Sequence, residues 1–329
     1  MTGSFFNVKV GNVRSDYASV NSGVPQGTIL GPLLFILFIN NVSARLSNSQ
    51  IQLYADDSKL YSRADSIEQC QLFERDISAL YHWFTSWQLK INFGKCEILH
   101  LGYNSLGYQY TINDHLIPPK EFCRDLGVCV DNRLSFHRHC LNIARNAHYK
   151  AKLFFRTFTC HDHDFYLFLY KTYIRPLVES GTQVWSPHSL QDIDIIESVQ
   201  RRFTKRLPGL FNYSYIARLE QLQLKTLEER RIANDLMFLF KMIHGQVDVD
   251  FNKYFSFNNN NFNTRGHSLK LNVNYSRLDC RRHFFCNRVI NIWNGLPESI
   301  ISLRRFDRFK IAINDYDLRI HCKGRAFNV

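Results

Sequence analysis

The hydrophobic pattern of this 329-residue chain becomes helical throughout from about Leu134 onward. Before that point, apolar and polar residues alternate in several short segments that are separated by Gly, Asn or Asp. This pattern predicts strands and hairpins. After it, apolar residues recur at helical spacing, and Pro or Gly closes most segments. We therefore expect an α+β chain whose later part is helical, over residues 135–157, 163–175, 190–206, 214–222, 226–244, 283–293 and 299–315.

Three hairpins and two helices are expected in the earlier part. The hairpins are predicted at residues 5–21 around Gly11, at residues 51–61, and at residues 108–118 with Asn113 and Asp114 at the turn. Residues 29–41 form a largely apolar segment that is predicted to be a helix, with Pro32 near its first turn. Residues 66–87 have the apolar spacing of an amphipathic helix.

Two adjacent carboxylates, Asp56 and Asp57, occupy the turn of the second hairpin within the sequence Tyr-Ala-Asp-Asp that begins at Tyr54. Carboxylate oxygens are the ligands that Mg²⁺ prefers. Aspartate pairs are also common in solvated surface turns, so the pair taken alone does not decide between the two interpretations.

The residues upstream of this hairpin strengthen the metal-site interpretation. Residues 22–28, Ser-Gly-Val-Pro-Gln-Gly-Thr, form a Gly- and Pro-punctuated loop that leads into the apolar helix. Gln26 and Gly27 would lie at the mouth of that helix, where a glycine allows another backbone or a base pair to approach closely.

Together, the sequence Gly-Val-Pro-Gln-Gly and, about 30 residues later, Tyr-Ala-Asp-Asp resemble motifs B and C of the reverse transcriptases of non-LTR (LINE-type, Jockey-like) retrotransposons. The resemblance implies that Pro25, Gln26, Gly27 and Tyr54 contact the template or incoming nucleotide. It also implies that Asp56 and Asp57 are catalytic and bind Mg²⁺.

Further segments resemble the same family in the same order. Residues 89–99 resemble motif D, in which Lys95 or Lys90 would help to protonate the pyrophosphate, and residues 122–131 resemble motif E, the primer grip. Residues 173–187, 196–204 and 292–297 also resemble family segments. The resemblance implies a partial palm at residues 1–130 with a mixed sheet and packed helices, a helical thumb or connection at 131–250, and a C-terminal region, expected to be helical, at 251–329.

The palm of this family also uses an aspartate of motif A, which precedes motif B. The sole acidic residue before Asp56 is Asp16, which falls on the first predicted hairpin and is not assigned to motif A. We therefore expect an N-terminally truncated palm without fingers, motif A or endonuclease. Two carboxylates from one turn do not enclose two Mg²⁺ ions about 3.5–4 Å apart, so we expect little or no polymerase activity from this chain alone.

A net charge of +12 favours a polyanionic partner, here an RNA template and a DNA primer. Basic residues gather in three clusters among aromatic side chains, most of which the helical spacing assigns to the core. The first cluster is the predicted nucleic-acid contact. The clusters are Arg201, Arg202, Lys205 and Arg206; Arg277, Arg281, Arg282 and Arg288; and Arg304, Arg305, Arg308 and Lys310.

A fourth charged segment alternates in sign: Glu220, Glu228 and Glu229 mix with Arg218, Lys225, Arg230 and Arg231. This pattern suits a solvated helix face as well as an RNA surface.

Nine cysteines, an odd number at irregular spacing, predict free thiols in a reducing compartment, cytoplasmic or nuclear, of a protein that is not secreted. No apolar run reaches membrane-spanning length. The Cys and His residues at 123–140 and 280–322 do not have the spacing of a zinc module, and Asp162 or Asp164 is expected to cap the next helix. Two alternatives to a reverse transcriptase stay open: a non-catalytic nucleic-acid-binding protein and a retroelement remnant without function.

Overall fold

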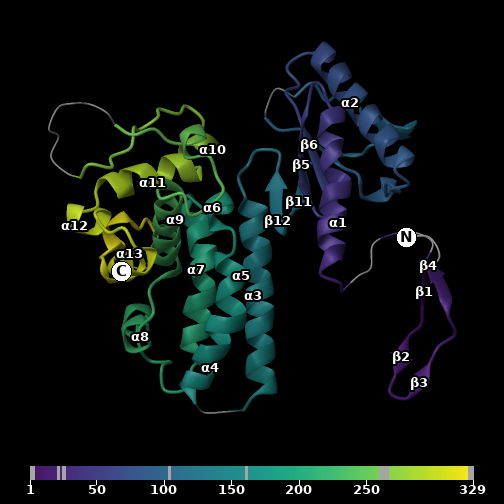
Figure 1. Cartoon of the computed structure of the whole chain (residues 1–329). Helices are drawn as coiled ribbons and strands as arrows, with labels where there is room; N and C mark the ends of the chain where they lie inside the picture. Colours follow the sequence, from purple (N-terminus) through teal and green to yellow (C-terminus); the bar gives the residue numbers. More distant parts are fainter. Residues whose placement is uncertain are drawn as a thin grey trace. The chain divides into compact units, whose positions relative to one another are not determined.

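A computed structural model describes residues 4–20, 23, 27–102, 105–159, 162–258 and 267–324 of the chain. The chain divides into two compact units, Met1–Glu121 and Phe122–Val329 (Figure 1). The first unit contains short strands and two main helices, and the second is almost entirely helical. The predicted α+β class is confirmed.

The first predicted hairpin is confirmed. Strand β1 (Ser4–Phe6) pairs antiparallel with β4 (Ala18–Val20), and β2 (Lys9–Val10) pairs with β3 (Val13–Arg14). Gly11 takes a φ of 60° at the turn, a conformation that glycine adopts without steric cost.

A short αββα segment forms the centre of the first unit. Helix α1 (Leu30–Ile39) is followed by a 3-10 helix (Asn40–Arg45), strands β5 (Gln50–Tyr54) and β6 (Asp57–Tyr61), and helix α2 (Ile67–Ser86). The side chain of Ser66 caps α2 by accepting a hydrogen bond from Gln69 N at 3.3 Å. Both predicted helices are confirmed.

The rest of this unit consists of two-residue strands. Strand β8 (Thr111–Ile112) pairs with β9 (His115–Leu116), and β7 (Ile98–Leu99) pairs in parallel with β10 (Pro119–Lys120). Asn113 and Asp114 both have positive φ, as a two-residue hairpin turn requires, so the third predicted hairpin is confirmed. Within the described residues, every sheet has two strands.

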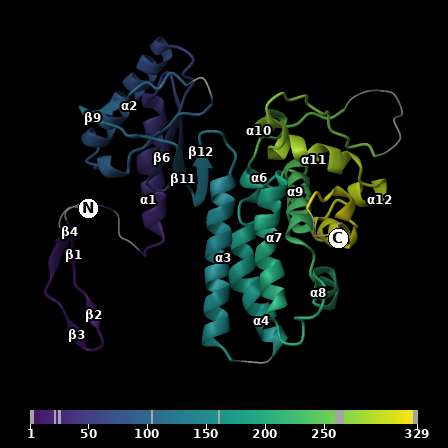
Figure 2. The ribbon, with the colours of Figure 1, turned by 180° about the vertical axis from the view of Figure 1, so that it is seen from behind.

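The second unit begins with the hairpin β11 (Phe122–Asp125) and β12 (Val128–Asp131). Helices of different lengths follow, and Figures 1 and 2 show α3, α5 and α7 running alongside one another. These helices are α3 (His137–Thr157), α4 (His163–Leu169), α5 (Arg175–Glu179), α6 (Thr182–Trp185), α7 (Leu190–Lys205), α8 (Tyr215–Gln221) and α9 (Leu227–Ile243).

The helix predicted at residues 163–175 differs in detail. It is capped by Asp162, whose Oδ1 accepts from Asp164 N at 2.9 Å, as expected. The chain does not leave the helical conformation before Pro176, however. One π-helical turn, Tyr170–Ile174, precedes α5 and places the proline in the first turn of a new helix, where its missing N–H costs nothing.

The C-terminal part contains α10 (Asp279–Arg282), α11 (Phe285–Asn294), α12 (Glu298–Ile301) and α13 (Phe306–Asp315). The prediction of one helix over residues 299–315 is wrong. Ile301 and Ile313 would lie about 120° apart on a continuous helix, but both are buried in one cluster because the chain turns at residues 302–305.

Two hydrophobic clusters stabilise the helical unit. One is built around Trp185, Ile196 and Phe203, and the other around Phe240 and Trp293. Helix α9 contributes to both, because Leu227 at its start belongs to the first cluster while its later residues belong to the second. Its position therefore sets how the two clusters are joined.

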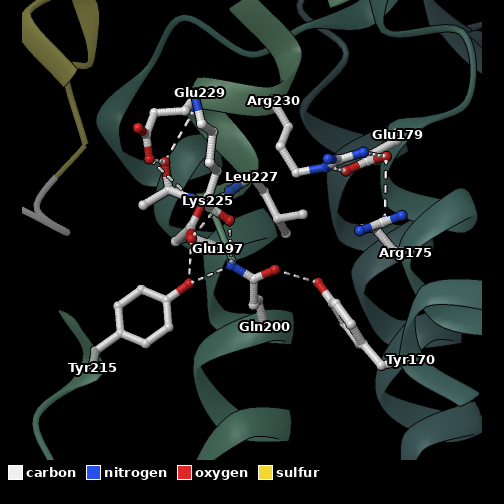
Figure 3. Close-up of polar contacts among 11 residues, drawn as sticks. Tyr170, Arg175, Glu179, Glu197, Gln200, Tyr215, Lys225, Leu227, Glu229 and Arg230 are labelled. Atoms are coloured by element: carbon white, nitrogen blue, oxygen red, sulfur yellow. Dashed lines mark hydrogen bonds and ion pairs between the residues drawn. The ribbon is translucent and has the colours of Figure 1, made fainter. Parts of the chain in front are cut away.

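A buried polar network holds the start of α9 (Figure 3). Glu197 is 2% exposed; its carboxylate accepts from Leu227 N at 3.0 Å and from the Tyr215 hydroxyl. Gln200 donates to that hydroxyl and accepts from Tyr170, whose O–H lies 2.7 Å from Gln200 Oε1.

The alternating charges near α8 and α9 do not form a solvated face. Arg218, Arg231 and Glu229 are at most 4% exposed. Arg218 donates to the Arg201 carbonyl near the end of α7 and to the Tyr213 carbonyl before α8, and Glu229 forms a capping box with Thr226. Arg218 and Glu229 therefore satisfy backbone groups at helix ends, a use that the charge pattern of the sequence does not distinguish from a solvated surface.

None of the helices in the described parts of the chain combines the length and apolar character needed to cross a membrane.

Candidate active site and nucleic-acid interface

The two candidate aspartates lie on a tight antiparallel hairpin. Tyr54 pairs with Asp57, which leaves Ala55 and Asp56 as the two turn residues. Ala55 has a φ of 52°, a left-handed conformation that is unfavourable for a residue with a Cβ atom. Strand pairing must hold this turn, so the positions of the two carboxylates depend on β5 and β6.

Packing fixes which face of the hairpin is turned to the protein. Ile51, Leu53 and Leu60 are half-buried against a cluster that contains Trp83 and Phe84 of α2. Asp56 and Asp57 are exposed, and so is Tyr54 at 66%. The apolar side chains anchor the hairpin while its acidic turn stays open to solvent.

Asp76 of α2 anchors the loop that leads into β5. Its carboxylate accepts hydrogen bonds from Ser47 N at 3.2 Å, Asn48 N at 2.8 Å and Ser49 Oγ at 2.7 Å. Burial raises the pKa of Asp76, but these hydrogen bonds, led by the Ser49 hydroxyl, outweigh it and leave the pKa below its ordinary value. This residue is a positioning residue that sequence reasoning missed, since a helical Asp among polar neighbours gives no signal of its long-range partners.

The predicted loop before α1 is partly described. Gly27 has a φ of 78°, which suits glycine, and Thr28 Oγ1 accepts from Gly31 N at 3.1 Å to cap the first turn of α1. Pro25 and Gln26 lie outside the described residues.

The predicted lysine stands apart from the aspartates. Lys95 ends a short 3-10 helix, Phe93–Lys95, and its side chain is exposed. Within the described part of the chain it forms no ion pair with Asp56 or Asp57.

The chemistry of Asp56 and Asp57 suits a hard divalent cation, because both offer carboxylate oxygens. Among the described residues, however, no three His, Cys, Asp or Glu side chains are grouped so that they could hold a metal ion. The turn therefore offers two adjacent carboxylates, and among the described residues no further side chain of these types completes a metal-binding group.

The basic cluster at the end of α7 rests on aromatic rings. Lys205 Nζ lies 4.9 Å from the centroid of Phe211, and the Arg206 guanidinium lies 4.3 Å from that of Phe155. Arg202 is exposed, whereas Arg201 is half-buried and lies 3.9 Å from Asp194. Three of the four cations that were predicted to contact a nucleic acid are thus exposed, and the charge of Arg201 is partly neutralised.

One arginine of the second basic cluster, Arg288, is largely buried and paired. Arg288 forms a two-point ion pair with buried Asp235, with Nε–Oδ2 at 2.8 Å and Nη2–Oδ1 at 3.0 Å. Its guanidinium also donates to the Thr182 carbonyl at 2.9 Å. Arg288 is therefore a structural cation and is not available to a nucleic acid.

Helix α3 carries a basic stripe that sequence reasoning missed. Five cations and no carboxylate occur in its 21 residues. Four of these cations, together with Tyr149, recur at spacings of seven, four, three and four residues, which place them on one helical face, and all five residues are exposed. We define this α3 stripe as Arg138, Arg145, Tyr149, Lys152 and Arg156. The signal was present in the sequence as an acid-free helix with its cations at helical spacing.

The match to known proteins concerns the first unit most directly. Residues 3–110 match the sequence model of the family described as reverse transcriptase (RNA-dependent DNA polymerase). The matched segment includes the Gly27 loop, α1 and the Asp56–Asp57 turn. The resemblance to reverse transcriptases that the motifs predicted is therefore confirmed for this segment of the chain.

The similar curated proteins are RNA-directed DNA polymerases of mobile elements. The chain is 25% identical to the RNA-directed DNA polymerase from mobile element jockey of Drosophila melanogaster over 222 residues. This alignment covers 62% of the chain. It is 29% identical over 151 residues to the jockey polymerase of Drosophila funebris. It is 25% identical over 224 residues, or 64% of this chain, to the probable RNA-directed DNA polymerase from transposon X-element of Drosophila melanogaster. The resemblance to non-LTR retrotransposon reverse transcriptases is confirmed.

The chain spans about a quarter of the length of the jockey and X-element proteins of Drosophila melanogaster, 24% in each case, and 16% of the Drosophila funebris protein. No solved structure gives a significant match.

The hydrogen bonds of Asp76 lead to a pH-dependent prediction. Because its pKa is lowered in the folded state, its ionised form stabilises the loop above the ordinary pKa of 3.8, and this stabilisation is lost as the pH falls through the lowered value. Asp76→Asn should lower the free energy of opening of the amides in residues 46–54 by about 1–3 kcal/mol at pH 7. Hydrogen exchange, corrected for the intrinsic exchange rates, measures this free energy.

The difference between wild type and Asp76→Asn should shrink towards pH 3. Glu68→Gln, an exposed change on the same helix, serves as the control and should leave the protection unchanged. A difference that is equal at pH 7 and pH 3 would contradict the assigned role.

Proposed function

We propose that this chain is the motif B to E and thumb portion of an RNA-directed DNA polymerase of the non-LTR retrotransposon class. In this assignment, residues 1–130 are a partial palm, residues 131–250 a thumb or connection, and residues 251–329 a C-terminal region. The proposed ligand is a duplex of RNA template and DNA primer. The match of residues 3–110 to the reverse transcriptase family supports the proposal.

The proposed roles follow the positions of the motifs. Asp56 and Asp57 would bind Mg²⁺, which in polymerases activates the attacking hydroxyl and stabilises the departing pyrophosphate. Gly27 and Tyr54, with Pro25 and Gln26 of the same loop, would contact the templating base or the incoming nucleotide. Lys95 would supply a proton to the pyrophosphate.

The two aspartates do not suffice for nucleotide transfer. Both come from one two-residue turn, and no third metal-binding side chain joins them in the described parts of the chain. A two-metal site holds the ions about 3.5–4 Å apart with carboxylates from more than one element. We therefore propose that the 329-residue polypeptide on its own has little or no polymerase activity.

The α3 stripe is the observation that best supports duplex binding. Cations spaced along about 27 Å of helix, at 1.5 Å per residue from Arg138 to Arg156, would follow a phosphate backbone. No carboxylate on α3 opposes them. The exposed cations Arg202, Lys205 and Arg206 extend the basic surface within the same helical unit.

A second candidate function, nucleic-acid binding without catalysis, is favoured by the same stripe. The basic surface belongs to Phe122–Val329, whereas the aspartates belong to the other compact unit. Duplex binding therefore does not require a complete metal site. The alternative of a remnant without function predicts neither activity nor salt-dependent binding.

Activity is tested by primer extension with the purified 329-residue protein, an RNA template, a DNA primer and Mg²⁺. We expect no extension above background, because the metal site has two ligands. Asp56→Asn and Asp57→Asn should then leave the background unchanged. Extension by the wild type that either substitution abolishes would overturn the proposed inactivity.

Binding is tested by measuring the affinity for an RNA–DNA duplex against salt concentration. Each phosphate contact contributes about 0.7–0.9 to the slope of log K against log salt, so Arg145→Gln with Lys152→Gln should reduce the slope by about 1.5. Arg63→Gln with Lys253→Gln removes the same charge from exposed sites outside α3 and should change it much less. An equal change in both double variants, or a wild-type affinity independent of salt, would exclude the α3 stripe as the binding surface.

A further inference from the structure

A basic cavity of about 420 Å³ lies in the helical unit, away from the α3 stripe and the end of α7. Its walls are formed by α9 and α13, with Gln183 of α6 at one side. Helices α6 and α13 both pack against α9 (Figure 1). All of its walls belong to one compact unit, so the cavity is defined by the packing of that unit alone.

The charges that line this cavity have one sign. Lys225, Arg230, Lys241 and Lys310 contribute four cations, and no carboxylate is among the lining residues that the structure describes. Arg230 is already neutralised by Glu179, with Nη2–Oε2 at 2.9 Å. The three lysines have no carboxylate within ion-pair distance in the described residues. They therefore leave an uncompensated positive charge at the cavity.

Aromatic side chains form the apolar part of the wall. Lys241 Nζ lies 4.3 Å from the centroid of Phe306, which places its ammonium group over the ring. Phe238 packs edge-on against Phe285, with centroids 5.4 Å apart. These contacts with the hydrophobic cluster hold both rings at the cavity.

Carboxamide groups complete the lining. The side chains of Asn234 and Asn314, which donate as well as accept hydrogen bonds, form none with the described residues. The backbone of Gln183 is fixed because its carbonyl accepts from Arg288 Nη2 at 3.3 Å, and Asp235 in turn holds that guanidinium. The cavity thus offers amide groups next to aromatic rings.

We propose that this cavity binds a single nucleotide, either free or as the phosphorylated end of a nucleic-acid strand. Lys241, Lys310 and Lys225 would hold the phosphate, Phe306 and Phe238 would contact the base, and the carboxamides would bond its edge. The volume lies within the range of small-molecule sites and is too small for a duplex. This proposal is independent of the polymerase assignment, because it uses none of the residues of the hairpin or of α3.

The test is calorimetric titration of the full-length protein with AMP, adenosine and inorganic phosphate. AMP should bind at least about tenfold more tightly than adenosine, because only AMP makes charge-assisted hydrogen bonds with the lysines. Lys241→Gln with Lys310→Gln should weaken AMP binding at least about tenfold. Arg308→Gln changes an exposed residue that lies on α13, like Lys310, but outside the cavity. It should leave the affinity for AMP unchanged.

Phe238→Leu separates base recognition from charge, because it keeps all of the lysines and the contact of Lys241 with Phe306. It should weaken AMP binding while leaving that of inorganic phosphate unchanged. A 5′-phosphorylated oligonucleotide that competes with AMP, when its 5′-hydroxyl counterpart does not, would identify a strand end as the ligand; competition by free nucleotides alone would identify a free nucleotide. No AMP binding at millimolar concentration, equal affinity for AMP and phosphate, or equal losses in the lysine variant and Arg308→Gln would each overturn the proposal.

Discussion

The carboxylate of Glu197 lies at the junction on which the helical unit depends. It comes from α7 and accepts a hydrogen bond from Leu227 N, the first residue of α9, and another from the Tyr215 hydroxyl. A helix N-terminus is a favourable place for a carboxylate, because its first N–H groups lack helical partners. Burial nevertheless raises the pKa of Glu197, while Tyr215 and the charge of Arg231 act in the opposite direction. The junction is thus polar and buried, and both oxygens of the Glu197 carboxylate accept hydrogen bonds.

The surfaces proposed to bind nucleic acid depend on this junction in different ways. On one side, α7 packs against α3 and holds the α3 stripe on a rigid helix. On the other side, α9 packs against α13 and forms the wall that carries Lys241. The hairpin with Asp56 and Asp57 has its own anchor, Asp76, within the other compact unit. The loop before the hairpin and the start of α9 are therefore each held by one buried acidic side chain that accepts hydrogen bonds from the backbone.

Most of the elements could be predicted from the sequence because they are encoded locally, although the turn that divides residues 299–315 into two helices could not. The turn at Asp56, the Asn113–Asp114 turn and the cap by Asp162 depend on neighbouring residues, and all are observed. The partners of the buried charged side chains could not be predicted, because those of Arg288 and Glu197 lie 53 and 30 residues away in the sequence. The site residues were found through the family motifs, whereas the α3 stripe required only that the cations of one helix be placed on its surface.

The role of the Glu197 junction is tested most directly by hydrogen exchange in the full-length protein carrying Glu197→Ala. We predict that protection falls by about 1–3 kcal/mol in α7 and α9 and also in α11 and α13, because misplacing α9 loosens both hydrophobic clusters. Glu220→Ala, an exposed change on α8, should leave all four helices unchanged. Loss of protection confined to the first turn of α9 would contradict this account, since Glu197 would then be a local cap and not the junction of the two clusters.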